Sequence, residues 1–164
     1  MIFPSKEWAE SYAKVVNDSE EYEASAKGWG IDYNGNFMFQ MDEVPVENID
    51  QMPEGDKKKT VKEFSDEYVK GKTMYIFLAL KDGKCTDARF VKDPSEVEVG
   101  FALSAKYEVW KEVLSGKSDP MKAIMQGKLK LGGDMMKIMK YTKGATLLGT
   151  LTANVPAEFF DEIK

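Results

Sequence analysis

The side chains that could carry nucleophilic or acid–base chemistry are few in this chain of 164 residues. The sequence contains no histidine, one cysteine, Cys85, and one arginine, Arg89. A thiol nucleophile needs a histidine or another cation to lower its pKa, and only Lys84 lies beside Cys85 in the chain. We therefore expect Cys85 to be an ordinary small residue of a strand. A lone cysteine also forms no intramolecular disulfide, which is typical of a cytoplasmic protein.

The acidic and glycine-rich segments offer no recognisable metal or nucleotide site. The acids at 18–23 and 43–56 lack the alternating oxygen ligands and the glycine of a calcium loop. Gly127 and Gly132 have the spacing of a phosphate-binding loop, but Gly133 and Asp134 stand where lysine and serine are required. We expect no catalytic residue, no metal and no cofactor, and therefore not an enzyme.

Methionine is concentrated in one part of the chain, since five of the ten methionines lie between residues 121 and 139. The methionine side chain is flexible and adapts to ligands of differing shape. The segment 134–151 is apolar on more than one side and contains Gly144 and Gly149, which weaken a helix. These features indicate a mobile apolar cover over a lipid pocket. The alternative is a stripe that only fills the core.

Lysines are gathered in the same region. Seven lysines and two aspartates lie between residues 117 and 143, although the formal net charge of the chain is −5. This asymmetry could orient the protein at an anionic membrane surface. The alternative is that these lysines form the solvated faces of amphipathic elements. Nucleic acid is not an expected partner, because the chain is acidic and has one arginine.

Composition and periodicity predict a single domain over residues 1–164. With 43% apolar and 31% charged residues, the chain is typical of globular proteins. The longest apolar run, 74–80, is too short to cross a bilayer, and the first twenty residues lack the apolar stretch of a signal peptide. Helices are expected at 5–16, 60–71, 105–114, from Pro120, and over 134–151, with N-terminal caps at Ser5, Thr60, Ser104 and Asp119. Strands are expected at 24–33, 36–41, 72–80, 86–92, 96–103 and 127–132, with hairpin turns at Asn34-Gly35 and 81–84, and residues 43–59 are expected to be an exposed excursion.

The run from Leu114 to Asp134, LSGKSDPMKAIMQGKLKLGGD, resembles the signature of the sterol carrier protein type two family. The turn at 82–84 and the strand at 97–103 fit the same pattern, and the similarity covers about residues 71–152. The resemblance implies an α+β fold with a mainly antiparallel five-stranded sheet, helices covering one face, and an apolar tunnel between them. It also implies a lipid ligand such as a fatty acid, a fatty acyl-CoA or a sterol or isoprenoid.

The expected tunnel lies between the sheet, the helix that carries Trp110 and the methionine-rich segment. Its expected lining is Phe101, Leu103, Trp110, Met121, Ile124, Met125, Leu129, Leu131, Met135, Met136, Ile138, Met139, Leu147 and Leu148. Lys128, Lys130, Lys137 and Lys140 are expected to hold a head group or to face a membrane. The main prediction is non-catalytic lipid binding, with transfer as an extension. The alternative is an interaction or dimerisation module, including a homodimer, in which the pocket is vestigial.

Overall fold

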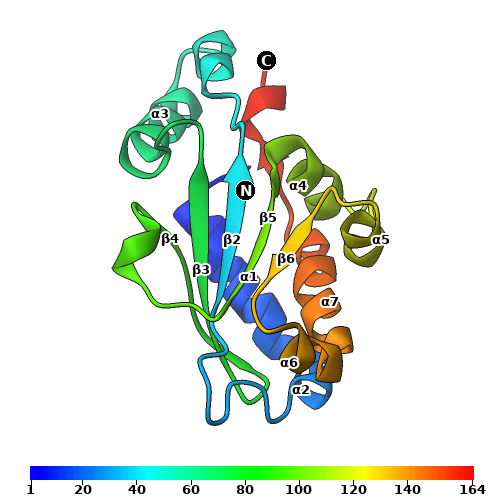
Figure 1. Cartoon of the computed structure of the whole chain (residues 1–164). Helices are drawn as coiled ribbons and strands as arrows, with labels where there is room; N and C mark the ends of the chain where they lie inside the picture. The colour runs from blue at the N-terminus through cyan, green and yellow to red at the C-terminus, as the bar shows by residue number, and fades with distance from the viewer.

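The computed structural model describes residues 1–164. A five-stranded sheet lies at the centre of the fold, in the order β4-β3-β2-β5-β6 (Figure 1). Its strands are β2 (Phe37–Asp42), β3 (Met74–Lys81), β4 (Lys84–Val91), β5 (Phe101–Lys106) and β6 (Lys130–Gly132). Only the β2–β5 pair is parallel. The predicted α+β fold with a mainly antiparallel five-stranded sheet is therefore confirmed.

In Figure 1 the first helix (blue) runs behind this sheet, and the helices that follow β5 lie along its right-hand side. The helices are α1 (Lys6–Asp18), α2 (Glu20–Ser25), α3 (Asp56–Tyr68), α4 (Tyr107–Leu114), α5 (Pro120–Met125), α6 (Met135–Lys140) and α7 (Thr142–Thr150). Short 3₁₀ helices are η1 (Val46–Gln51), η2 (Pro94–Glu96), η3 (Leu151–Asn154) and η4 (Phe160–Glu162). A two-stranded parallel ribbon of β1 (Ile2–Phe3) and β7 (Glu158–Phe159) joins the two ends of the chain.

The two faces of the sheet differ because side chains alternate along each strand. The face toward the helices joins the main core through Phe37, Phe39, Met41, Met74, Ile76, Leu78, Phe101 and Leu103. The opposite face carries a smaller cluster of Met38, Phe77 and Val91, against which Val97 and Val99 pack. These two valines belong to the connection from β4 to β5, which runs across the front of the sheet in Figure 1. Helices therefore cover one face, and a loop covers part of the other.

The predicted first hairpin is wrong. Residues 24–33 are not a strand, because Ser19 caps α2 by accepting a hydrogen bond from the Tyr22 amide, and turns follow that helix. Gly28 has φ +91°, and a Cβ there would lie 2.8 Å from the Tyr141 hydroxyl. The Asn34 side chain accepts from the Asn36 amide at 2.9 Å, so Asn34 shapes a turn into β2 and not a hairpin.

Two predicted caps are also wrong. The third helix begins at Asp56, four residues before Thr60, so Thr60 lies inside it. Ser104 remains in β5, because pairing with both β2 and β6 continues through that position. The excursion at 43–59 is exposed only in part, since Val44, Ile49 and Met52 enter the core. Sheet pairing thus overrides the local capping signal at Ser104.

Other local predictions are confirmed. Ser5 caps α1 by accepting from the Trp8 amide at 3.1 Å, and Asp119 caps α5 by accepting from the Met121 amide at 3.0 Å. The hairpin between β3 and β4 is present. The expected long segment at 134–151 is divided at Tyr141 into α6 and α7.

Asn17 joins the end of α1 to the first residues of β4. Its side chain donates to the Cys85 carbonyl at 2.7 Å and accepts from the Cys85 amide at 2.8 Å. We expect Asn17→Ala to lower the free energy of unfolding by about 1–3 kcal/mol, because two backbone groups lose their partner. Urea denaturation measures this change. The control is Lys14→Ala on the same helix, and equal stability of the two variants would contradict the assignment.

Candidate functional site

The floor of the candidate site is the part of the sheet that lies under α4 and α7. Phe101 and Leu103 on β5 and Trp110 on α4 are all buried. The Trp110 indole donates to the Gln40 carbonyl at 2.9 Å, and its ring lies 4.8 Å from that of Phe39. The structure therefore brings these three predicted residues together in the core.

The other predicted lining residues divide by exposure. Leu129, Ile138 and Leu148 are buried in the same core, and Ile124, Leu131 and Leu147 pack against it while partly exposed. Met121 is also partly exposed. In contrast, Met125, Met135, Met136 and Met139 have exposed fractions of 81, 50, 79 and 72%. These four side chains face solvent, and that they line a ligand site stays a prediction.

The apolar cavity between sheet and helices is small. It has a volume of about 10 Å³ and is bounded by Tyr22, Ala26, Trp29, Phe37, Tyr141, Gly144, Ala145 and Leu148. Only Leu148 belongs to the predicted lining. A void of this volume holds about one water molecule, whereas ligand pockets span about 300–1,000 Å³. The expected tunnel is not open in this structure, because aromatic side chains fill the space between the layers.

Trp29 is the centre of that aromatic packing. Its ring centroid lies 4.7 Å from Phe101, 5.3 Å from Tyr141, 5.4 Å from Tyr33 and 5.9 Å from Phe37. The Trp29 indole donates to the Gly35 carbonyl at 2.7 Å, which fixes the ring. We call Trp29, Tyr33, Phe37, Phe101 and Tyr141 the aromatic cluster.

Sequence reasoning missed most of the aromatic cluster. A strand at 24–33, as the sequence predicts, would point alternate residues away from the core. The glycines on either side of Trp29 were the available signal, because Gly28 and Gly30 both have positive φ and form turns. Those turns place both Trp29 and Tyr33 against the ring of Phe101.

The four predicted head-group lysines fall into two places. Lys128 and Lys130 border an open groove of about 570 Å³, whose wall also contains Asp42, Glu108 and Glu112. Lys137 and Lys140 lie on α6. The Lys137 ammonium stands 4.8 Å above the Tyr33 ring and 3.3 Å from a carboxylate oxygen of Asp134. Lys137 is thus the lysine in contact with the aromatic cluster.

The titratable groups of the core are tuned by burial and not by catalytic partners. Burial raises the pKa of the Cys85 thiol to about 11, and its sulfur donates weakly to the Asp87 carbonyl. Burial also raises the pKa of Tyr12, whose hydroxyl donates to the Leu148 carbonyl at 2.5 Å. Raised values keep both groups protonated at neutral pH, so neither acts as a nucleophile there.

Cysteine, aspartate and glutamate side chains nowhere gather in a group of three that could ligate a metal. None of the helices combines the length and apolarity needed to span a membrane.

Solved structures similar to this one share its whole architecture. A crystal structure of sterol carrier protein 2 matches with a TM-score of 0.68 and 25% sequence identity, over 93% of this chain and 98% of that one. A conserved hypothetical protein of Thermus thermophilus, described as a sterol carrier protein candidate, matches with a TM-score of 0.66 and 25% identity, over 94 and 90% of the two chains. No curated protein sequence matches significantly.

The sequence itself matches a family model over residues 49–145, which is more than half of the chain. The matched range contains the run at 114–134 on which the resemblance was based. It also contains every strand of the five-stranded sheet except β2. The chain belongs to the SCP-2 sterol transfer family.

Proposed function

We propose that this protein binds one lipid, such as a fatty acid, a fatty acyl-CoA or a sterol or isoprenoid, between the sheet and the segment formed by α6 and α7. We call residues 134–150 the lid. The observation that carries the proposal is the apolar cavity at the junction of sheet and lid, with seven of its eight lining residues hydrophobic. Family membership supports lipid as the ligand class.

A lipid can occupy this site only if the lid moves, because the closed cavity is far smaller than an acyl chain. Few interactions hold the lid closed. The Tyr141 ring packs edge-on against Trp29, the Leu148 carbonyl accepts from Tyr12, and an ion pair of 3.3 Å joins Lys143 to Glu21. Both side chains of that ion pair are mostly exposed, so it contributes little.

The break at Tyr141 is the natural hinge. The chain leaves helical geometry there, with φ −123° and ψ 29°, and α7 begins at the next residue. Gly144, in the first turn of α7, lies close to α2, because a Cβ there would already be in van der Waals contact with Ser25 and Ala26. Gly149, in the last turn, packs closely on Pro120. We therefore expect α6 to swing about Tyr141 while α7, packed at Gly144 and Gly149, stays fixed.

The energetics of binding suit a carrier without catalytic groups. Burial of a sixteen-carbon chain contributes on the order of 11 kcal/mol at about 0.8 kcal/mol per methylene. The loss of translational and rotational entropy on association offsets several kcal/mol of this gain, and displacement of the lid offsets more. The balance, about 7 kcal/mol, corresponds to affinity in the micromolar range. We assign Lys137 to the ligand's carboxylate or phosphate, since it touches the aromatic cluster and faces only Asp134.

A second candidate is an interaction or dimerisation module with a vestigial pocket. The closed aromatic cluster favours it, because well-packed rings stabilise a core that binds nothing. Such a module would retain its oligomeric state when the cavity is filled and would take up no lipid. The following variant separates the two functions.

Ala145 belongs to the lid and lines the cavity, so Ala145→Phe places a ring in the cavity. We expect it to weaken binding of a fluorescent fatty acid tenfold or more, because the ring occupies the space that the chain requires. Fluorescence titration measures the Kd. The control is Ala102→Phe, which alters an equally half-buried alanine on the opposite face of the sheet. Unchanged affinity in a folded Ala145→Phe protein would place the ligand elsewhere, and absence of uptake in every variant would favour the interaction module.

The stability of α6 depends on pH through the carboxyl group of Asp134. Its side chain caps α6 by accepting from the amides of Met136 and Lys137, and the Lys137 ammonium lowers the pKa of the carboxyl below its ordinary value of 3.8. A lowered folded-state pKa means that the cap stabilises α6 above pH 3.8 and is lost as the pH falls through the lower folded value.

We expect the amide resonances of Met136 and Lys137 to titrate together with a midpoint below 3.8 in NMR spectra. Asp134→Asn should keep the cap and remove the titration, because asparagine also accepts at an N-cap and carries no charge. A midpoint at or above 3.8 would contradict the assignment of Lys137 as the partner.

A further inference from the structure

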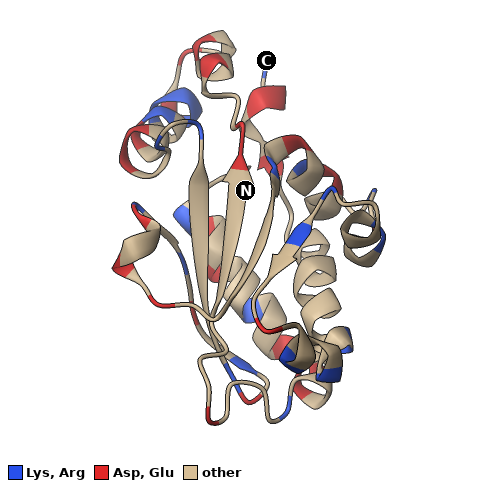
Figure 2. Ribbon diagram, in the orientation of Figure 1, with Lys and Arg blue, Asp and Glu red and all other residues tan.

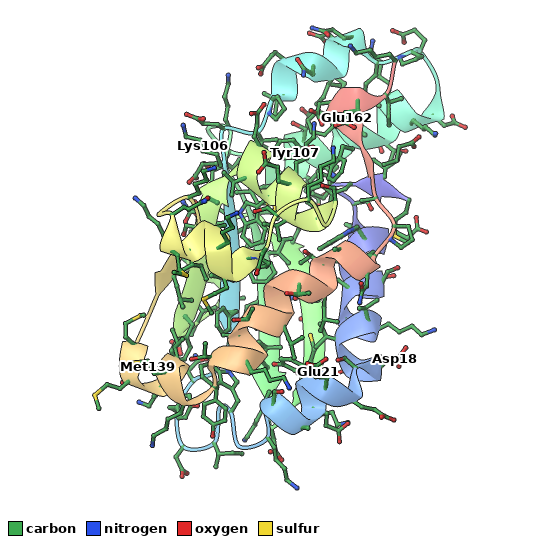
Figure 3. All side chains as sticks on the ribbon, turned by 90° about the vertical axis from the view of Figure 1, so that its right-hand side faces the viewer. Asp18, Glu21, Lys106, Tyr107, Met139 and Glu162 are labelled. Carbon is green, nitrogen blue, oxygen red and sulfur yellow. The ribbon has the colours of Figure 1, made fainter.

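Helix α6 presents its methionines to solvent. The chain has five exposed large hydrophobic side chains, and three of them, Met135, Met136 and Met139, lie on this helix of six residues. Figure 3 shows Met139 projecting from the edge of the molecule, away from its body. Exposed apolar side chains gathered in one place mark an interaction surface, whereas single ones need no explanation. Packing of the core therefore does not account for the exposed methionines of α6.

The charges around these methionines are positive. Lys137 and Lys140 lie on the same helix, and Lys140 has no carboxylate oxygen within 4.0 Å. Figure 2 shows blue segments on α6, and Figure 3 places Met139 at the left edge, away from Asp18 of α1 on the right. The exposed side of α6 is therefore basic in a chain whose net charge is −5.

We propose that α6 is the surface with which the protein docks on an anionic lipid membrane. Met135, Met136 and Met139 enter the boundary between head groups and acyl chains, and Lys137 and Lys140 contact the lipid phosphates. Unbranched methionine side chains adapt to that disordered boundary. Lysines keep their ammonium groups at head-group level while their methylene stems lie along the apolar region.

The inference rests on the proposed function, because it makes the docking surface and the lid one element. Ile138 of α6 is buried against the core, while the methionines on either side of it face outward. Tyr141 follows α6 directly and packs on Trp29. When the methionines of α6 enter a membrane, the helix is drawn away from the aromatic cluster and the cavity opens toward the lipid.

A membrane fits this surface better than a protein partner does. Stable protein interfaces bury about 800 Å² on each partner and are built around a packed apolar centre. One short helix with protruding flexible side chains offers less than that. The surrounding lysines match the charge of an anionic membrane and would repel a second copy of the same surface.

The test is flotation of the whole protein with vesicles of phosphatidylcholine alone and of phosphatidylcholine with about one-third phosphatidylserine. We expect binding to the anionic vesicles that weakens as salt is added. Met135→Ser, Met136→Ser and Met139→Ser combined should lower the partition coefficient tenfold or more, and Lys137→Gln with Lys140→Gln should remove the preference for phosphatidylserine.

Matched controls test whether the effect is specific to α6 or follows from the loss of any exposed methionine or lysine. Met125→Ser removes an equally exposed methionine on α5, and Lys59→Gln with Lys62→Gln removes two exposed lysines on α3. Both should bind anionic vesicles as the unaltered protein does. Loss of binding in these controls as well, or full binding by the triple methionine variant, would overturn the proposal.

Two readouts distinguish failure of this inference from failure of the proposed function. Uptake of a fluorescent fatty acid by the unaltered protein in solution, without vesicles, tests the proposed function alone. Fatty acid uptake without any vesicle binding would overturn the docking surface alone, whereas vesicle binding without uptake would overturn the ligand site. A dimer that dissociates in the triple methionine variant, measured by sedimentation, would assign α6 to contact between copies and also overturn the proposal.

Discussion

The helix-facing side of the sheet must be kept from water, and this requirement places most other elements of the fold. Phe37, Phe39, Phe101 and Leu103 form an apolar surface that no single helix could cover. Helices α1 and α4 pack onto it, α7 packs against α4, and the turns after α2 insert Trp29 among its rings. Because the aromatic side chains on this surface fill the space between the sheet and the helices, the closed structure retains only a small cavity.

That packing makes the lid the adjustable part of the molecule. The sheet and α1 are joined by backbone pairing and by buried side chains, so their separation would cost most of the folding energy. The lid is held by the Tyr141–Trp29 ring contact, the buried hydrogen bond from Tyr12, the buried side chains of Ile138 and Leu148 and a surface ion pair, and it is divided at Tyr141. A ligand that exchanges the Tyr141 contact for its own apolar chain therefore displaces the least structure.

Periodicity predicted the parts of the fold that depend on local signals. The β3–β4 hairpin and the caps at Ser5 and Asp119 could be predicted because each depends on neighbours within four residues. The cap expected at Ser104 failed because pairing with a distant strand decides that position, and the cap expected at Thr60 failed because the helix begins four residues earlier, at Asp56. The aromatic cluster could not be predicted either, since Trp29 and Tyr141 are far apart in the chain. The family resemblance supplied the topology that periodicity left open.

The central claim is that the chain carries a lipid in a site that is closed here by the lid. Native mass spectrometry of gently purified protein, compared with an organic extract of the same sample, tests it most directly. The account predicts one fatty acid, sterol or isoprenoid species bound per chain, released when the protein unfolds. A protein that purifies without lipid and also takes up no added fatty acid would contradict it.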